Sequence, residues 1–184
     1  TPASTTGLVG FTLTGYIVSP TQIQLIESDH DQGFHLAGMA LGQGSNTGTF
    51  SAPSLAGKTF VFGSSGLDAS NLVLDLAGAF AFGSNNALSG SMAVNDLSAF
   101  GVNTITGGSY TVGSTGRVTL SGVTLSDINE TLAFQLYLDG NGNAMVMGAD
   151  SVQVTAGPAY LQTSTSPASS GPYGLTTMGF LADS

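Results

Sequence analysis

The stretch Phe134-Gln-Leu-Tyr-Leu-Asp-Gly-Asn-Gly-Asn-Ala-Met-Val-Met-Gly-Ala149 carries the pattern that decides the fold class of this chain. Apolar side chains occupy every second position from Phe134, as they do in a half-buried strand, and a second apolar run ends the stretch. Asp139-Gly-Asn-Gly142 lies between the two runs and consists of residue types that accept the positive φ of a tight turn. The stretch therefore predicts an antiparallel β-hairpin.

The same pattern extends along most of the chain. Short runs rich in Val, Phe, Leu and Thr alternate with clusters of Gly, Asn, Asp and Ser, whereas helical periodicity is nearly absent. Spacing of roughly 8 to 12 residues per strand, with no helix between strands, favours an all-β fold, either an antiparallel β-sandwich or a barrel. Strands are expected near 8–18, 21–27, 33–41, 47–51, 58–64, 71–82, 88–94, 103–112, 117–125, 131–138, 143–149, 152–162 and 173–180. The side chains expected in the core are Phe60, Phe62, Leu72, Leu74, Phe80, Phe82, Tyr110, Val112, Leu120, Phe134, Leu136, Val146 and Met147.

The charge composition excludes several classes of protein. Charged residues make up 7% of the chain, against about 25% in typical soluble domains. The net charge is -9, and Lys58 and Arg117 are the only Lys or Arg residues, so nucleic-acid binding is not expected. These two cations are expected to pair with nearby acids or to contact a neighbouring subunit. The absence of cysteine excludes disulfides, thiolate metal sites and cysteine nucleophiles.

The composition also bears on location. Few charges and many Ser and Thr residues favour the outside of the cell. No run of about 18 apolar residues is present, so membrane insertion is not expected. The chain begins Thr1-Pro2 without an initiator Met, which suits a mature form left after signal cleavage. We therefore expect a secreted protein, extracellular or on a cell surface.

Three pairs of segments resemble each other at a similar separation along the chain. The pairs are 11–15 with 118–122, 23–38 with 134–149, and 57–70 with 171–184, offset by 107 (118 minus 11), 111 (134 minus 23) and 114 (171 minus 57) residues. A repeat of about 110 residues is therefore predicted. Residues 1–54 are expected to form the second half of one unit, 55–163 a complete unit, and 164–184 a linker with the opening strand of a third.

The complete unit also carries several short motifs. They are Gly78-Ala-Phe80, Asn95-Asp96, Gly108-Ser-Tyr-Thr-Val-Gly-Ser-Thr-Gly-Arg117 and Asp139-Gly-Asn-Gly-Asn-Ala144. Beyond this unit, Gly171-Pro-Tyr173 matches the motif with which a unit begins. With these motifs, most of 55–163 resembles the tandem β-rich repeat domains of large secreted bacterial surface proteins. The resemblance implies a β fold without catalytic residues. The N-terminal half-unit departs from the pattern because it lacks the Arg and the Gly-rich turn.

A half-unit taken alone exposes strand edges whose N–H and C=O groups pair readily with other chains. Residues 163–172 have the composition of a flexible linker and lead into a strand-like segment at 173–181. One hypothesis is that this segment is donated to the N-terminal half-unit of the next copy. Head-to-tail donation gives a filament when the copies do not close into a ring. The alternative is that it closes the barrel of its own chain. The contact residues in the first case are Tyr173, Leu175, Met178 and Phe180.

Acidic and histidine side chains cluster in Glu27-Ser-Asp-His-Asp31 and His35. On an extended strand Glu27, Asp29 and Asp31 share one face, and carboxylates with imidazoles bind divalent cations. Asp29, Asp31 and His35 are therefore weak candidates for metal ligands. A solvated hairpin tip is the favoured interpretation, because the aligned stretch of the other unit is a plain Asp-Gly-Asn-Gly turn, and no metal is predicted.

A second metal-like pattern begins at Asp139, where Asp139, Asn141 and Asn143 match the opening of a calcium loop. Such a loop needs Gly at its sixth position, which here is Ala144. The pattern therefore favours a hairpin turn.

Signatures of catalysis are absent from the sequence. No Gly-x-Ser-x-Gly stretch exists, and both histidines fall in one predicted turn region. Asp68, Asp75, Asp96 and Asp127 are the acids available for glycoside cleavage, but nothing in the sequence places them in an aromatic-lined cleft. We expect no enzymatic activity and no cofactor. Asn129-Glu-Thr131 is a glycosylation sequon, which makes Asn129 a candidate for modification.

These features together predict a non-catalytic structural subunit of a filament-like extracellular assembly, joined to copies of itself by strand complementation. The alternative is a carbohydrate- or surface-binding adhesin module, in which loops at one end of the fold hold a surface glycan. Exposed aromatic side chains such as Tyr16 and Phe34 would favour the alternative.

Overall fold

The computed structural model describes residues 12–28, 37–96 and 99–166. The chain divides into two compact units, Thr1–Asn46 and Thr47–Ser184. Each unit is described by itself. The predicted all-β class is confirmed in both.

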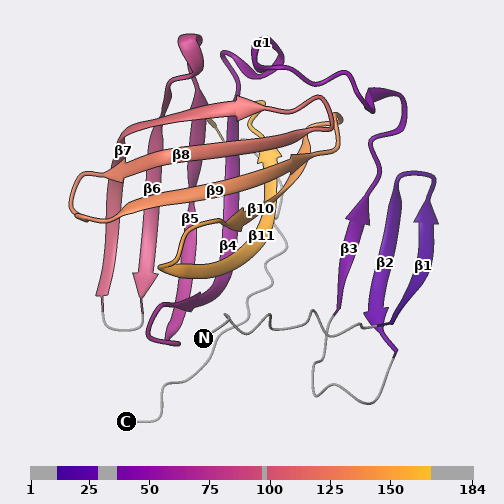
Figure 1. The fold of residues 1–184 in the computed structure, drawn as a ribbon, viewed down its shortest axis with the longest axis horizontal. Coiled ribbons are helices and arrows are strands. Elements are labelled where there is room, and N and C mark those ends of the chain that lie inside the picture. Colours follow the sequence, from indigo (N-terminus) through magenta and orange to yellow (C-terminus); the bar gives the residue numbers. More distant parts are fainter. Residues whose placement is uncertain (1–11, 29–36, 97–98, 167–184) are drawn as a thin grey trace, which may run out of the picture. The chain divides into compact units, whose positions relative to one another are not determined.

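The first unit contains a small antiparallel sheet (Figure 1). Its strands are β1 (Leu13–Ser19), β2 (Gln22–Glu27) and β3 (Ala37–Leu41), in the order β1-β2-β3. A short 3-10 turn, η1 (Gly44–Asn46), follows the sheet.

The second unit is a closed barrel of eight antiparallel strands (Figure 1). The strands are β4 (Thr59–Asp68), β5 (Val73–Phe82), β6 (Leu88–Asp96), β7 (Ala99–Val112), β8 (Arg117–Leu125), β9 (Thr131–Leu138), β10 (Asn143–Gly148) and β11 (Gln153–Leu161). Each strand pairs with the next one along the chain, and pairing of β11 with β4 closes the ring. Two short helical turns complete the unit, α1 (Ala52–Leu55) and η2 (Ser84–Asn86).

The strand expected at 47–51 is wrong. The chain turns there into α1, whose Pro53 has no N–H to give to a strand ladder. The hydroxyl of Ser54 donates a hydrogen bond to the Ser51 carbonyl at 2.6 Å, which fixes the turn locally. Leu55 is buried in the barrel core, so α1 covers the end of the barrel at which β4 begins.

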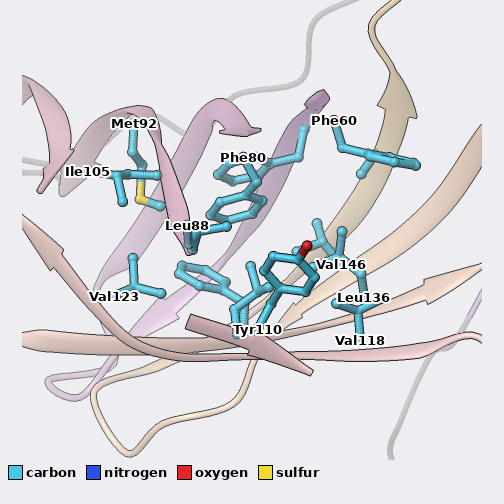
Figure 2. Close-up of a cluster of buried hydrophobic side chains, with 14 of the residues drawn as sticks. Phe60, Phe80, Leu88, Met92, Ile105, Tyr110, Val118, Val123, Leu136 and Val146 are labelled. Atoms are coloured by element: carbon cyan, nitrogen blue, oxygen red, sulfur yellow. The ribbon is translucent and has the colours of Figure 1, made fainter. Parts of the chain in front are cut away.

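Aromatic rings fill the middle of the barrel. Phe62 stacks on Phe80 with ring centroids 4.4 Å apart, and Phe134 lies 5.3 Å from Phe80. Tyr110 meets Phe82 edge to face at 4.9 Å. Figure 2 shows the side chains from several strands converging on this interior. Ring packing of this kind adds to the stabilisation from area burial alone.

The predicted core is confirmed at ten positions, namely Phe60, Phe62, Leu74, Phe80, Phe82, Tyr110, Leu120, Phe134, Leu136 and Val146. Val112 is half-buried and packs against the core. Leu72 and Met147 are wrong, since both side chains are 42% exposed. Leu72 lies in the turn before β5, and Met147 takes the outward position of β10 next to the inward Val146.

Gly90 shows how closely two strands of the barrel approach. Its φ is +139°, and a Cβ at this position would lie 1.9 Å from the carbonyl oxygen of Ala79 on β5. A side chain there has no room, and positive φ is disfavoured for L residues. Glycine therefore permits the local approach of β5 and β6.

The predicted hairpin at Asp139 is confirmed, and one carboxylate organises it. Asp139 Oδ1 accepts hydrogen bonds from the backbone N–H groups of Asn141 at 2.7 Å and Asn143 at 2.9 Å. Its Oδ2 accepts from Asn143 Nδ2 at 2.6 Å. The two glycines of the turn have φ of +82° and +95°. The oxygens that a calcium loop would direct at an ion are thus engaged within the turn.

Candidate functional site

Within the described residues, both faces of the β1-β2-β3 sheet carry exposed apolar side chains, and Tyr16 (65%), Ile26 (49%) and Met39 (41%) share one of them. Paired residues on neighbouring strands share a face, so the register Ile17↔Ile23↔Ala40 and Gly15↔Leu25↔Gly38 defines the other face. Ile17 is 80% exposed, although it lies opposite Ile23 in the middle of the face. We call this surface, formed by Leu13, Ile17, Ile23, Leu25 and Ala40, the apolar sheet face; Glu27 lies on it at one end, opposite Leu13.

None of the residues in β1, β2 and β3 is buried. Three-stranded sheets normally depend on burying one hydrophobic face. In the described part of the chain, β1 and β3 each pair with β2 alone, so each has one edge without a strand partner. The described sheet thus combines exposed apolar side chains on both faces with two edges able to accept a strand.

The two ends of the barrel differ in charge. β4, β6, β8 and β10 finish at one end, because neighbouring strands are antiparallel. The connections at this end carry the carboxyl groups of Asp68, Asp96, Asp127, Glu130 and Asp150. Lys58 and Arg117 lie at the opposite end, together with Asp139. We call the first of these the acidic end.

The acidic end holds a cavity of about 510 Å³. Its apolar lining consists of Leu74, Leu76, Val94, Ile128, Leu132 and Val152. Its polar lining includes the carboxyl side chains Asp68, Asp96, Asp127 and Glu130 and the amide side chains Asn103 and Gln153. Phe100 also lines the cavity, but its side chain is 71% exposed and, by alternation with the inward Asn103, lies on the outer face of β7.

Gln153 is held by partners on both sides of its amide. It is 3% exposed, its Nε2 donates to Asp150 Oδ2 at 3.0 Å, and its Oε1 accepts from the Thr155 hydroxyl at 2.9 Å. Asp150 also accepts hydrogen bonds from the backbone N–H groups of Ala133 at 2.7 Å and Val152 at 3.0 Å. This network satisfies the buried amide and joins β9 to β11.

Asn103 and Asp96 lack such partners. Asn103 is also 3% exposed, but its side-chain amide forms no hydrogen bond with the described residues. Asp96 Oδ1 is also buried without a partner among the described residues, whereas Ser64 Oγ, which likewise has none, does not line the cavity. Buried polar atoms are almost always satisfied in folded proteins, so open groups that line a cavity are places for water or a ligand.

The fold brings together three of the four acids that the sequence offered for glycoside cleavage. Asp68, Asp96 and Asp127 line the cavity, whereas Asp75 lies on the outer face of β5 and accepts a hydrogen bond from the Ser65 hydroxyl at 2.5 Å. Glu130 was not singled out from the sequence, because only barrel closure places it beside the other three. Among the described residues, no group of three or more His, Asp or Glu side chains is arranged to hold a metal ion.

The other candidate residues are distributed as follows. Asn129 is exposed in the connection between β8 and β9, where a sugar has access. Lys58 and Arg117 are exposed, and neither has an ion pair with any residue that the structure describes. The metal candidates Asp29, Asp31 and His35 and the contact candidates Tyr173, Leu175, Met178 and Phe180 lie outside the described residues, as does Phe34.

Among the described residues, no helix combines the length and the apolar character needed to cross a membrane.

Comparison with protein-family models, curated proteins and solved structures finds no match to this chain. The resemblance to tandem repeat domains of bacterial surface proteins therefore stays a prediction from the motifs.

Proposed function

We propose that the protein is a non-catalytic structural subunit of a secreted or cell-surface filament, in which copies join by β-strand complementation. The observation that carries the proposal is the apolar sheet face. Apolar surface of this kind on a folded unit favours contact with another chain, since its removal from water is the main favourable term in association. In this proposal the segment 173–181 of a second copy pairs with the edge of β1, so that its apolar side chains extend the apolar sheet face.

The barrel supports donation over self-closure. Residues 59–161 form a ring in which every strand has two neighbours, so the barrel closes without the C-terminal segment. The segment with Tyr173, Leu175, Met178 and Phe180 lies outside the described residues, and in our proposal it is the donated strand.

The repeat gives a reason for the choice of acceptor. The alignment places β1 opposite part of β8 and β2 opposite part of β9, and in the barrel β8 and β9 each pair on both sides. β1 pairs on one side only in the described part of the chain. A strand from another copy supplies the kind of neighbour that β8 finds in β7.

Other apolar side chains on the surface suit lateral packing of copies. Val61 and Leu67 on β4 are each 41% exposed, and on the adjacent β11 Val154 is 79% and Tyr160 54% exposed. Paired positions join them, since Val154 is opposite Leu67 and Tyr160 is opposite Val61. This outer surface gives a filament a second, side-by-side contact.

Two matched substitutions on β1 test the acceptor. Ile17→Lys puts a charge on the apolar sheet face, and Thr14→Lys puts the same charge on the opposite face of the same strand. Because both side chains are exposed, neither change is expected to unfold the sheet. Negative-stain microscopy with light scattering is expected to show fibres for the parent and for Thr14→Lys but not for Ile17→Lys. Equal assembly of the two variants contradicts the proposed acceptor face.

A synthetic peptide of residues 171–184 tests the donor. Added in excess to the full chain, it is expected to occupy the acceptor sheets and shorten the fibres. The control peptide carries Ser in place of Tyr173, Leu175, Met178 and Phe180. Fibres that are unaffected by deletion of residues 171–184 would refute strand donation.

The alternative function is a carbohydrate- or surface-binding adhesin module. Tyr16, which is 65% exposed on the other face of β1, is a side chain able to stack on a sugar ring. Monodisperse monomers that bind a glycan surface, with loss of binding in Tyr16→Ala, would favour this function over the filament.

A further inference from the structure

We propose that the cavity at the acidic end of the barrel binds a small organic cation, an ammonium group carried on an apolar aryl or alkyl body. This inference concerns the interior of the barrel and stands independently of assembly through the apolar sheet face.

The first argument is charge. Asp68, Asp96, Asp127 and Glu130 line the cavity, and the chain's Lys and Arg side chains both lie at the other end of the barrel. A cavity lined by charges of one sign concentrates the field and attracts ligands of the opposite sign. Anionic ligands are correspondingly disfavoured.

The second argument is the state of the polar groups. Asn103 is 3% exposed, lines the cavity and forms no side-chain hydrogen bond within the described chain, and Asp96 Oδ1 is buried without a partner. An ammonium group has three N–H donors and no acceptor, so it can donate either to the Asn103 carbonyl or to the carboxylate of Asp96, which lies four residues along β6 from Met92, the residue paired with Asn103. The neighbouring amide of Gln153 is fully engaged with Asp150 and Thr155, so the missing partners are specific to one side of the cavity.

The third argument is the shape and lining. A volume of about 510 Å³ falls within the range of roughly 300–1,000 Å³ that small-molecule sites occupy. Most of the lining is apolar, from Leu74, Leu76 and other aliphatic side chains, and this suits the body of the ligand.

A bare metal ion fits less well. No group of three or more potential metal-ligating side chains converges in the described part of the protein, so the carboxylates are spread around the cavity. Spread charges with an apolar wall match an extended organic cation better than a compact ion, which needs several oxygens at one point.

Three matched probes test the proposal on the full chain. Phenylbutylammonium, phenylbutanol and 5-phenylpentanoate share the phenylbutyl body and differ in the charge of the head group. Isothermal titration at low salt is expected to show the ammonium binding at least about tenfold tighter than the alcohol, with the anion weakest. The advantage of the ammonium over the alcohol is expected to shrink at high salt, because part of it comes from charges near solvent.

Variants locate the site. Asp96→Asn is expected to weaken binding of the ammonium about tenfold, and Asn103→Val, which leaves the net charge unchanged, to weaken it severalfold. Asp75→Asn removes the same charge as Asp96→Asn from the outer face of β5 and is expected to leave the affinity within about twofold. Circular dichroism of each variant checks that the barrel is folded.

The outcomes separate cleanly. Equal affinity for the ammonium and the alcohol, or no binding of any probe, overturns the proposal. An equal loss in Asp75→Asn and Asp96→Asn also overturns it, because attraction by the overall negative charge then explains the binding.

Discussion

Replacing Asn103 by Val is expected to stabilise the barrel, although the residue is 3% exposed. A buried polar group without a protein partner costs up to about 1–3 kcal/mol, and the lower figure applies here because water that enters the cavity of about 510 Å³ solvates part of the Asn103 amide. Val also suits a strand and has room on the cavity side. The expected gain is about 1 kcal/mol, or roughly 5 °C in Tm for a domain of this size.

Gln153→Leu is the matched comparison, since it also replaces a buried amide that lines the same cavity. Here the substitution removes two hydrogen bonds and leaves the Thr155 hydroxyl, in a residue 4% exposed, without its acceptor. Such a loss costs about 2 kcal/mol after the gain in apolar burial is allowed for. The two variants are therefore expected to differ by about 3 kcal/mol, with opposite signs relative to the parent.

Urea unfolding followed by circular dichroism measures both changes, with the slope of the transition checked for constancy. A decrease in stability for Asn103→Val as large as that for Gln153→Leu would refute the reasoning. It would mean that the Asn103 amide has hydrogen-bond partners in the folded protein and is not open to a polar group of a ligand.

Two further comparisons test the fold. Asp139→Ala removes the acceptor of three hydrogen bonds in a residue 5% exposed, and is expected to cost about 3 kcal/mol in urea unfolding. Asp68→Ala removes two backbone hydrogen bonds at a half-exposed turn and is expected to cost about 1 kcal/mol, so equal losses would contradict the assigned role of Asp139. Gly90→Ala is expected to lower stability by at least about 2 kcal/mol, because its Cβ meets the backbone at positive φ. Gly63→Ala, with no atom within 4 Å of the new Cβ, is expected to change stability by less than about 0.5 kcal/mol, and similar Tm values for the two glycine variants would contradict the close approach of β5 and β6.

Local sequence predicted the strands of the barrel well because their signals are local. Alternation with a period of two and the Asp-Gly-Asn-Gly turn act over a few residues, so Phe134, Leu136 and Val146 were placed correctly in the core. The failures have local causes too. Leu72 is apolar but lies in a turn, and the Val146/Met147 pair gave no clue as to which side chain faces inward.

The candidate cavity was only partly predictable. Asp68, Asp96 and Asp127 were recognised as available acids, but they lie far apart in sequence and their convergence depends on barrel closure. Nothing in the sequence distinguished Asp75, which lies on the outer face of β5, from these three.

The sequence by itself determined the all-β class, the tight turns and most of the core, because these follow from periodicity and from the φ preferences of single residues. Only the tertiary structure decided that the strands close into a barrel, that the acids gather at one end, and that Gln153 is satisfied while Asn103 is not. The physical reason is that hydrogen-bond partners and charge clusters arise from the pairing of strands distant along the chain, and two amides of similar chemistry differ only in the neighbours that this pairing supplies.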